Sequence, residues 1–278
     1  MQAELPTLTF LPLDALIIHE RHDDQRSRPL ITRMRNSGVF RNPPIVSPIK
    51  DGSGRHMVLD GANRTVALKE MGFRHALVQV VQPDHPGLNL QNWNHIIWEL
   101  SPVRFLSGIH NLPGIRMAPE NNPDVQPNLF GECGLALVCS CNAHTYNLCT
   151  SAEDLETRVE LLNEIVDSYK DRARLDRTSS RDVNMLGRIY PQFSGLVIFP
   201  NFKIEVVMQL ASKGYLLPSG LTRFTISPRA LHLNYPLDEL DSDAPLEAKN
   251  ERLHKWLQER LNHKQVRYYA ESTFLFDE

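Results

Sequence analysis

A short polar turn between two apolar segments carries the residue types best suited to chemistry. Its members are Asp60, Gly61, Ala62, Asn63 and Arg64. The apolar residues 57–59 before the turn predict the end of a buried strand, and residues 65–71 after it predict a helix that stops at Gly72. The first N–H groups of such a helix have no partner within the helix, so they form a seat for an anion, usually a phosphate.

The side chains of this turn suit an anion site. Gly61 and Ala62 let an anion approach the backbone, and Asn63 can add a donor. Arg64 can hold a phosphate through two parallel hydrogen bonds. Asp60 places a carboxylate beside the seat, which a phosphate tolerates best when a divalent cation lies between them. The structural alternative is a plain turn in which Asn63 caps the helix and Arg64 is solvated.

A second candidate is the carboxylate of Glu20, forty residues before Asp60. Residues 15–19 are mostly aliphatic and partly β-branched, which predicts a strand, and Glu20 belongs to the polar run that follows. A carboxylate at the tip of a strand suits a catalytic base, because the strand fixes its position while the tip exposes it. A solvated loop is the structural alternative.

The surrounding pattern predicts one α+β domain over residues 1–84. In order, it predicts a helix at residues 25–37, a strand entered through Pro43 and Pro44, a hairpin turn at 51–54 and a strand at 76–81.

This succession resembles the ParB/sulfiredoxin superfamily over about the first 85 residues. Partition proteins of that superfamily have a turn rich in glutamate and arginine, and sulfiredoxins have a cysteine within it. This chain has neither, and because no cysteine precedes Cys133, thiolate chemistry at the turn is excluded. The chain is most similar to the branch of free L-serine kinases. These join the fold to a C-terminal domain and make O-phospho-L-serine, in some members for siderophore biosynthesis.

The resemblance implies ATP or ADP as phosphoryl donor, Mg²⁺ as cofactor and free L-serine as acceptor. It implies that Asp60 is catalytic and binds the metal, and that Glu20 is the essential glutamate of the family. The implied nucleotide-binding residues are Gly61, Ala62, Asn63, Arg64 and Thr65. The turn of the family ends in His-Arg, whereas Asn63 stands here at the histidine position. Asn63 can donate to a phosphate but cannot exchange a proton.

Pro83, Pro86 and Gly87 mark a hinge, so residues 85–278 are expected to form a second domain. Apolar side chains in residues 93–100 have helical spacing. The remaining pattern predicts strands at 135–141 and 195–199, helices from Ser151, at 204–212 and after Asp243, and a long loop over 111–128. This mixture again predicts an α+β domain.

The resemblance to serine kinases extends to three residues of this second domain. Trp93 matches a tryptophan near the amino-acid substrate, with Trp98 as the alternative. Thr222 would contact the substrate through its hydroxyl, and the forked guanidinium of Arg223 would hold the serine carboxylate. The structural alternative for the pair is a hairpin with a surface arginine.

Composition limits the classes of function. The formal net charge of −3 argues against a large surface for nucleic acid. No apolar run reaches the eighteen or so residues of a membrane helix, and the N-terminus lacks the pattern of a secretory signal. The four cysteines form no secreted framework, so the cytoplasm is the expected location.

The cysteines and one histidine also invite a zinc or haem interpretation. They are Cys133, Cys139, Cys141, Cys149 and His144. Their spacing lacks paired Cys-x-x-Cys motifs, and two cysteines on one face of a strand are more typical of a core.

The hypothesis is therefore a nucleotide-dependent kinase for the hydroxyl of L-serine, with Glu20 as base. One alternative is a non-catalytic nucleotide-binding or regulatory protein of the partition type. The other is an enzyme on this scaffold for a different hydroxylated amino acid. The sequence does not distinguish ATP from ADP, and it leaves the oligomeric state open.

Overall fold

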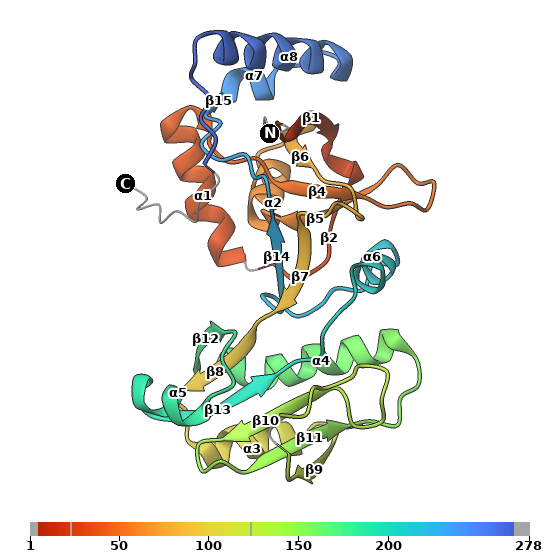
Figure 1. The fold of residues 1–278 in the computed structure, drawn as a ribbon, viewed down its shortest axis with the longest axis vertical. Helices are drawn as coiled ribbons and strands as arrows, with labels where there is room; N and C mark the ends of the chain where they lie inside the picture. The colour runs from red at the N-terminus through yellow and green to blue at the C-terminus, as the bar shows by residue number, and fades with distance from the viewer. Residues whose placement is uncertain (1–4, 23, 123, 270–278) are drawn as a thin grey trace.

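Two β-sheets, each with its own helices, organise the chain, and a two-stranded ribbon runs between them (Figure 1). The structure is a computed structural model that describes residues 5–22, 24–122 and 124–269. We call the part around the first sheet the N-terminal lobe and the part around the second sheet the C-terminal lobe. The α+β class predicted from the sequence is confirmed.

The N-terminal sheet has five strands in the order β1-β6-β4-β5-β2. They are β1 (Thr7–Pro12), β2 (Leu16–Ile18), β4 (Ile45–Pro48), β5 (His56–Asp60) and β6 (His75–Val80). β2 runs parallel to β5, with Ile18 opposite Val58. Both strands therefore end at the same end of the sheet. There β2 leads to Glu20 and β5 leads into the turn at Gly61.

Two helices of the N-terminal lobe pack against each other. α1 (Asp24–Ser37) confirms the helix predicted at residues 25–37. α2 (Ala62–Glu70) begins directly after Gly61, three residues earlier than predicted. The early start follows from the left-handed backbone of Gly61 (φ 93°), which turns the chain out of β5 so that Ala62 is already helical. A short 3₁₀ helix, η1 (Leu13–Ala15), joins β1 to β2.

The end of the described chain returns to the N-terminal lobe (Figure 1). β15 (Tyr235–Pro236) pairs with β3 (Val39–Phe40), and α7 (Leu237–Asp241) and α8 (Leu246–Asn262) follow. Leu240 and Leu253 are buried in the same cluster as Phe10. The sequence analysis assigned all residues after 85 to the second domain. The packing differs, because β15, α7 and α8 belong to the N-terminal lobe although they come last in the chain.

The C-terminal sheet has six strands in the order β12-β8-β13-β10-β11-β9, all antiparallel to their neighbours. They are β8 (Asn94–Trp98), β9 (Arg116–Glu120), β10 (Ala136–Ser140), β11 (Thr145–Cys149), β12 (Arg174–Thr178) and β13 (Phe193–Ile198). α3 (Pro102–His110) and α4 (Leu155–Lys170) pack into the core on one face, and α5 (Val183–Ile189) packs on the other.

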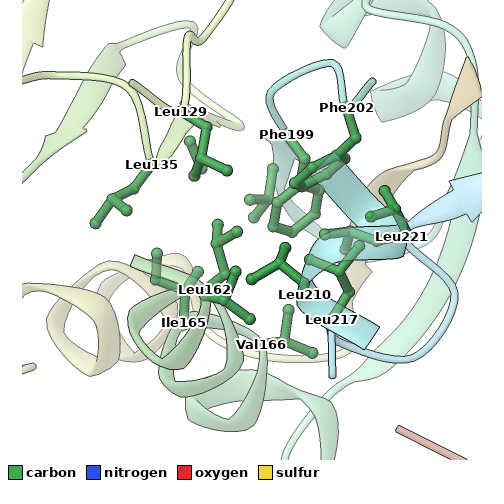
Figure 2. Close-up of a cluster of buried hydrophobic side chains, with 14 of the residues drawn as sticks. Leu129, Leu135, Leu162, Ile165, Val166, Phe199, Phe202, Leu210, Leu217 and Leu221 are labelled. Carbon is green, nitrogen blue, oxygen red and sulfur yellow. The ribbon is translucent and has the colours of Figure 1, made fainter. Parts of the chain in front are cut away.

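The largest core continues from the C-terminal lobe toward the N-terminal lobe. Figure 2 shows Leu162, Ile165 and Val166 of α4 opposite Phe199, Phe202 and Leu210. Leu210 belongs to α6 (Ile204–Ser212), which also contacts β2. The ribbon between the lobes consists of β7 (Leu88–Asn92) and β14 (Thr222–Ile226), with Thr222 opposite Asn92. The lobes are thus joined by packed side chains as well as by the ribbon.

Two predictions about the second domain were wrong. Residues 94–98 form β8 and not a helix, because this strand is central and both of its faces are buried, as Ile96 and Ile97 show. Helical spacing cannot distinguish such a strand from a buried helix. The predicted loop at 111–128 contains β9, which pairs along β11. The predicted strands at 135–141 and 195–199 and the helix at 204–212 are confirmed.

Across the part of the chain that the structure describes, no helix combines the length and the apolar character that a membrane span requires.

We expect Leu253→Ala to destabilise the protein by about 2–5 kcal/mol, because Leu253 is 1% exposed and its truncation leaves a cavity between α8 and the N-terminal sheet. Leu231→Ala is the matched control, since Leu231 is 51% exposed. The free energy of unfolding in urea measures both. Equal values for the two variants would show that α8 does not pack against the N-terminal lobe in solution.

His95 of β8 predicts a pH-dependent stability. Burial, assisted by the charge of Arg177, lowers the pKa of His95 to about 3. Between pH 6.5 and this value the unfolded chain binds a proton that the folded chain does not, so the free energy of unfolding falls with falling pH. The limiting slope for one histidine is about 1.4 kcal/mol per pH unit.

His95→Gln, which cannot titrate, should remove most of that slope between pH 6 and 4. His254→Gln on the exposed face of α8 is the control and should leave the slope unchanged. Urea unfolding at a series of pH values measures the effect. An unchanged slope in His95→Gln would contradict the burial of a neutral His95.

Candidate active site

A cavity of about 700 Å³ lies where the edge of the N-terminal sheet meets the ribbon. The loop after β2, the turn before α2, the face of α1 and the start of β14 all contribute to its wall. Its lining is strongly basic and includes Arg21, Arg33, Arg64, Arg177, Arg223 and Arg229. Among the described residues, the carboxylates in the wall are Glu20 and Asp60. A cavity of this size and charge suits a small polyanionic ligand.

The turn before α2 has the geometry of an anion seat. Gly61, Ala62 and Asn63 line the cavity, and α2 starts at Ala62, so the unpaired N–H groups of its first turn lie at the cavity wall. A Cβ on Gly61 would lie 2.7 Å from Nη2 of Arg64 and 3.0 Å from Cα of Pro44. Glycine is therefore required at this position by both space and backbone conformation.

Asp60 and Arg64 are joined by a third residue that the sequence analysis missed. Arg64 donates to Oδ2 of Asp60 at 3.2 Å, and Arg229 donates to the same oxygen. Burial lowers the pKa of the Arg64 guanidinium, and Asp60 acts in the opposite direction. The buried Nε of Arg64 has no hydrogen-bond partner among the described residues. An unsatisfied buried donor beside a helix N-terminus supports an anion at this place.

Glu20 is held in the cavity wall by the segment that leads into β14 of the ribbon. Its Oε2 accepts from the N–H of Gly220 and its Oε1 accepts from the N–H of Thr222, both at 2.6 Å. The Thr222 hydroxyl also donates to Oε1, at 2.5 Å. Gly220 has φ +77°, and a Cβ there would overlap the guanidinium of Arg177. The three hydrogen bonds from Gly220 and Thr222 fix the position of the Glu20 carboxylate.

The predicted substrate-binding residues meet in the same wall. Trp93 follows β7 and Arg223 lies in β14, and the guanidinium of Arg223 lies 4.4 Å from the centroid of the Trp93 ring. The alternative, Trp98, donates its indole N–H to Asp176 at 3.0 Å and is not part of the lining. The structure therefore selects Trp93 over Trp98 as the tryptophan of the cavity.

Two predicted site residues take other positions than expected. Thr65 is fully buried, and its hydroxyl donates to the carbonyl oxygen of Gly61 at 3.2 Å. It stabilises the turn and does not reach the cavity, because the first turn of α2 directs it inward. The hydroxyl of Thr222 lies between Glu20 and Nε2 of His19, so it is engaged by these two side chains and does not point freely into the cavity.

Several residues of the wall escaped the sequence analysis. They are His19, Arg33, Arg177, Gly220 and Arg229. His19 is adjacent to Glu20, and its neighbourhood to a candidate base was the available signal. Arg33 is an exposed arginine of α1, and its local sequence does not distinguish it from an ordinary solvated side chain. Arg177 and Arg229 come from distant segments, and no local pattern marks them.

The cysteine cluster does not form a metal site in the part of the chain that the structure describes. Cys133 and Cys149 form a disulfide, and burial raises the pKa of the Cys139 thiol. No group of three or more histidine, cysteine, aspartate or glutamate side chains within the described ranges could hold a metal ion. A metal at the cavity would therefore need oxygen atoms of a ligand in addition to Asp60.

The sequence and the fold of this chain are both similar to those of known proteins. No protein-family model matches the chain. The ATP-dependent L-serine kinase SbnI of Staphylococcus aureus is 23% identical over 277 residues, which are 98% of this chain and 97% of SbnI. An ATP-dependent L-serine kinase of Staphylothermus marinus is 30% identical over 83 residues, which are 30% of this chain and 32% of that kinase.

The similarity to the L-serine kinase SbnI extends over 98% of this chain. A solved structure of SbnI with a C-terminal truncation has a TM-score of 0.71 at 24% identity and covers 92% of this chain and 97% of that one. A free serine kinase in complex with AMP has a TM-score of 0.68 at 15% identity and covers 86% and 98%. The predicted resemblance to serine kinases is confirmed, and the assignment to the ParB/sulfiredoxin superfamily stays a prediction.

We expect Arg229→Gln to weaken the binding of inorganic tripolyphosphate by about tenfold, which corresponds to about 1.4 kcal/mol for one lost charged contact. The matched control is Arg252→Gln, an exposed arginine of α8 that pairs with Glu239 and lies outside the cavity lining. Isothermal titration calorimetry measures both affinities. Equal affinities in the two variants would place the anion away from Asp60 and Arg229.

Proposed function

We propose that this chain is a kinase that transfers a phosphoryl group from ATP to the hydroxyl of free L-serine and forms O-phospho-L-serine. One observation carries the proposal: the Glu20 carboxylate and the turn at residues 61–64 line the same cavity. Phosphoryl transfer requires an aligned hydroxyl, a base and a seat for the phosphates within one site. Relatives that are ATP-dependent L-serine kinases support the choice of donor and acceptor.

The phosphates of the nucleotide bind at the N-terminus of α2. The unpaired N–H groups of its first turn and the side chain of Asn63 donate to them, and Arg64 adds charge from within the wall. Asn63 replaces the histidine of the resembled kinases, so it contributes hydrogen bonds only. Arg229 brings a second guanidinium to Asp60 and adds positive charge to the cavity wall.

The donor set also fits a Mg²⁺ ion that enters with the nucleotide. Mg²⁺ prefers one or two carboxylates together with phosphate oxygens and water. Arg64 and Arg229 both donate to Oδ2 of Asp60, and within the described residues Oδ1 receives no hydrogen bond. Oδ1 is thus the atom of this chain that would hold the ion, which neutralises charge on the transferred group.

The serine binds between Glu20 and the ribbon. Arg223 offers its forked guanidinium to the serine carboxylate, and Trp93 holds that guanidinium in place from its other face. Oε2 of Glu20 accepts one hydrogen bond, from Gly220, so it retains a lone pair for the serine hydroxyl. Glu20 orients this hydroxyl toward the phosphate and takes its proton.

The test is incubation with ATP or ADP, Mg²⁺ and a panel of amino acids, with the products identified by mass. We expect phosphorylated L-serine, a strong preference for ATP and little product from L-alanine or from ethanolamine, which lack the hydroxyl and the carboxylate respectively. A phosphorylated product from another hydroxylated amino acid alone would replace the acceptor. Nucleotide binding without any product would favour the non-catalytic alternative.

We expect Glu20→Gln to lower turnover by about 10²–10⁴-fold, because the amide keeps the shape of the side chain but cannot take a proton. Nucleotide affinity should stay within about threefold of the wild type, since the loss concerns the chemical step. Glu251→Gln on the exposed face of α8 is the matched control. A loss of nucleotide affinity in Glu20→Gln would instead assign Glu20 to the nucleotide site or to the fold.

A further inference from the structure

We propose that His19 is a positioning residue that acts as an imidazolium through Thr222 and presents Oε2 of Glu20 to the substrate. His19 donates from Nε2 to the Thr222 hydroxyl, and that hydroxyl donates to Oε1 of Glu20. The inference rests on the proposed function, because it assigns a role in the presentation of the base. It concerns a buried histidine that none of the preceding steps uses.

The protonation state of one ring nitrogen of His19, Nδ1, follows from its hydrogen-bond partner. Nδ1 lies 2.7 Å from the carbonyl oxygen of Val58, and a carbonyl oxygen only accepts hydrogen bonds. Nδ1 therefore carries a proton. The ring is 5% exposed and lies edge-on to Phe224 with centroids 5.3 Å apart, so its orientation is fixed by packing on β5 and β14.

The hydrogen bonds from Nε2 of His19 through Thr222 to Glu20 require one proton more than a neutral imidazole and an ionised carboxylate supply. Nε2 lies 2.7 Å from Oγ1 of Thr222, and Oγ1 lies 2.5 Å from Oε1 of Glu20. The hydroxyl has a single proton and can donate to one of these two neighbours only. With a neutral imidazole and an ionised carboxylate, one of the two short contacts would join two acceptors. The chain of three groups therefore contains an additional proton, either on Nε2 or on Glu20.

The surroundings of Glu20 place that proton on His19. The N–H groups of Gly220 and Thr222 donate to the two carboxylate oxygens, and such hydrogen bonds favour the ionised form of a carboxylate. Nε2 of His19 lies 3.9 Å from Oε1, close enough for an imidazolium to stabilise the anion.

The consequence concerns the geometry of the base. Oε1 receives two donors, from the N–H and the hydroxyl of Thr222, whereas Oε2 receives one, from Gly220. Oε1 is thereby occupied, and Oε2 is the oxygen that meets the serine hydroxyl. Removal of the imidazolium would release the Thr222 hydroxyl from this orientation and loosen the carboxylate.

Two variants interrupt the chain at different points. His19→Asn retains a donor to the carbonyl of Val58 but is too short to reach Thr222. Thr222→Val keeps the shape of the side chain and removes the hydroxyl, while Thr222→Ser retains the hydroxyl. Thr225→Val is the matched control, since Thr225 lies on the same strand outside the cavity lining.

We expect turnover of His19→Asn and Thr222→Val to fall by about ten- to a hundredfold, the range that a small misplacement of a reacting group produces. The KM for serine and the affinity for ATP should stay within about threefold of the wild type. Thr222→Ser should recover most of the turnover, and Thr225→Val should match the wild type. Unchanged turnover, or a loss confined to KM, would overturn the proposal.

Nitrogen NMR of the wild-type protein labelled with ¹⁵N at histidine tests the charge without any turnover. We expect both ring nitrogens of His19 to be protonated at pH 7, and the Nε2 resonance to change in Thr222→Val but not in Thr225→Val. An unprotonated Nε2 would overturn the proposal whether or not the enzyme is active. Absence of phosphoserine with the wild type would instead refute the proposed function, and the NMR result would still decide the role of His19.

Discussion

The parallel pairing of β2 with β5 is the constraint on which the site depends. It directs two chain segments off the same end of the sheet, so Glu20 and Gly61 line one cavity although they lie forty-one positions apart in the sequence. An antiparallel pairing would have placed the two segments at opposite ends of the sheet. The position of Glu20 relative to the turn at Gly61 therefore follows from backbone hydrogen bonds, before any side chain contributes.

The segment of residues 217–222 forms the hydrogen bonds that hold the chain around Glu20. Leu217 donates its N–H to the carbonyl of His19 and accepts from the N–H of Arg21, so the chain around Glu20 is held by this segment on both sides. Gly220 and Thr222 then bind the carboxylate itself. Glu20 follows β2 of the N-terminal lobe, but its hydrogen bonds come from the segment that leads into the ribbon, so the candidate active site includes the junction of the lobes.

The charge of the cavity lining differs from the net charge of the chain. The chain has a formal net charge of −3, yet the described part of the cavity wall holds six arginines and two carboxylates. Asp60 is paired with the charges of Arg64 and Arg229, and the Glu20 carboxylate is stabilised by backbone donors. The field inside the cavity is therefore positive, which suits a nucleotide and an amino-acid carboxylate together.

The sequence alone determined the local parts of this site. The turn at Gly61, the helix after it and the strand before Glu20 follow from residue type and spacing, because each depends on neighbours within a few residues. The tertiary structure decided which distant groups meet: Arg229 at Asp60, Thr222 at Glu20, and α8 at the N-terminal sheet. The helical pattern at residues 93–100 misled because burial on both faces, a tertiary property, makes an apolar run that either structure can produce.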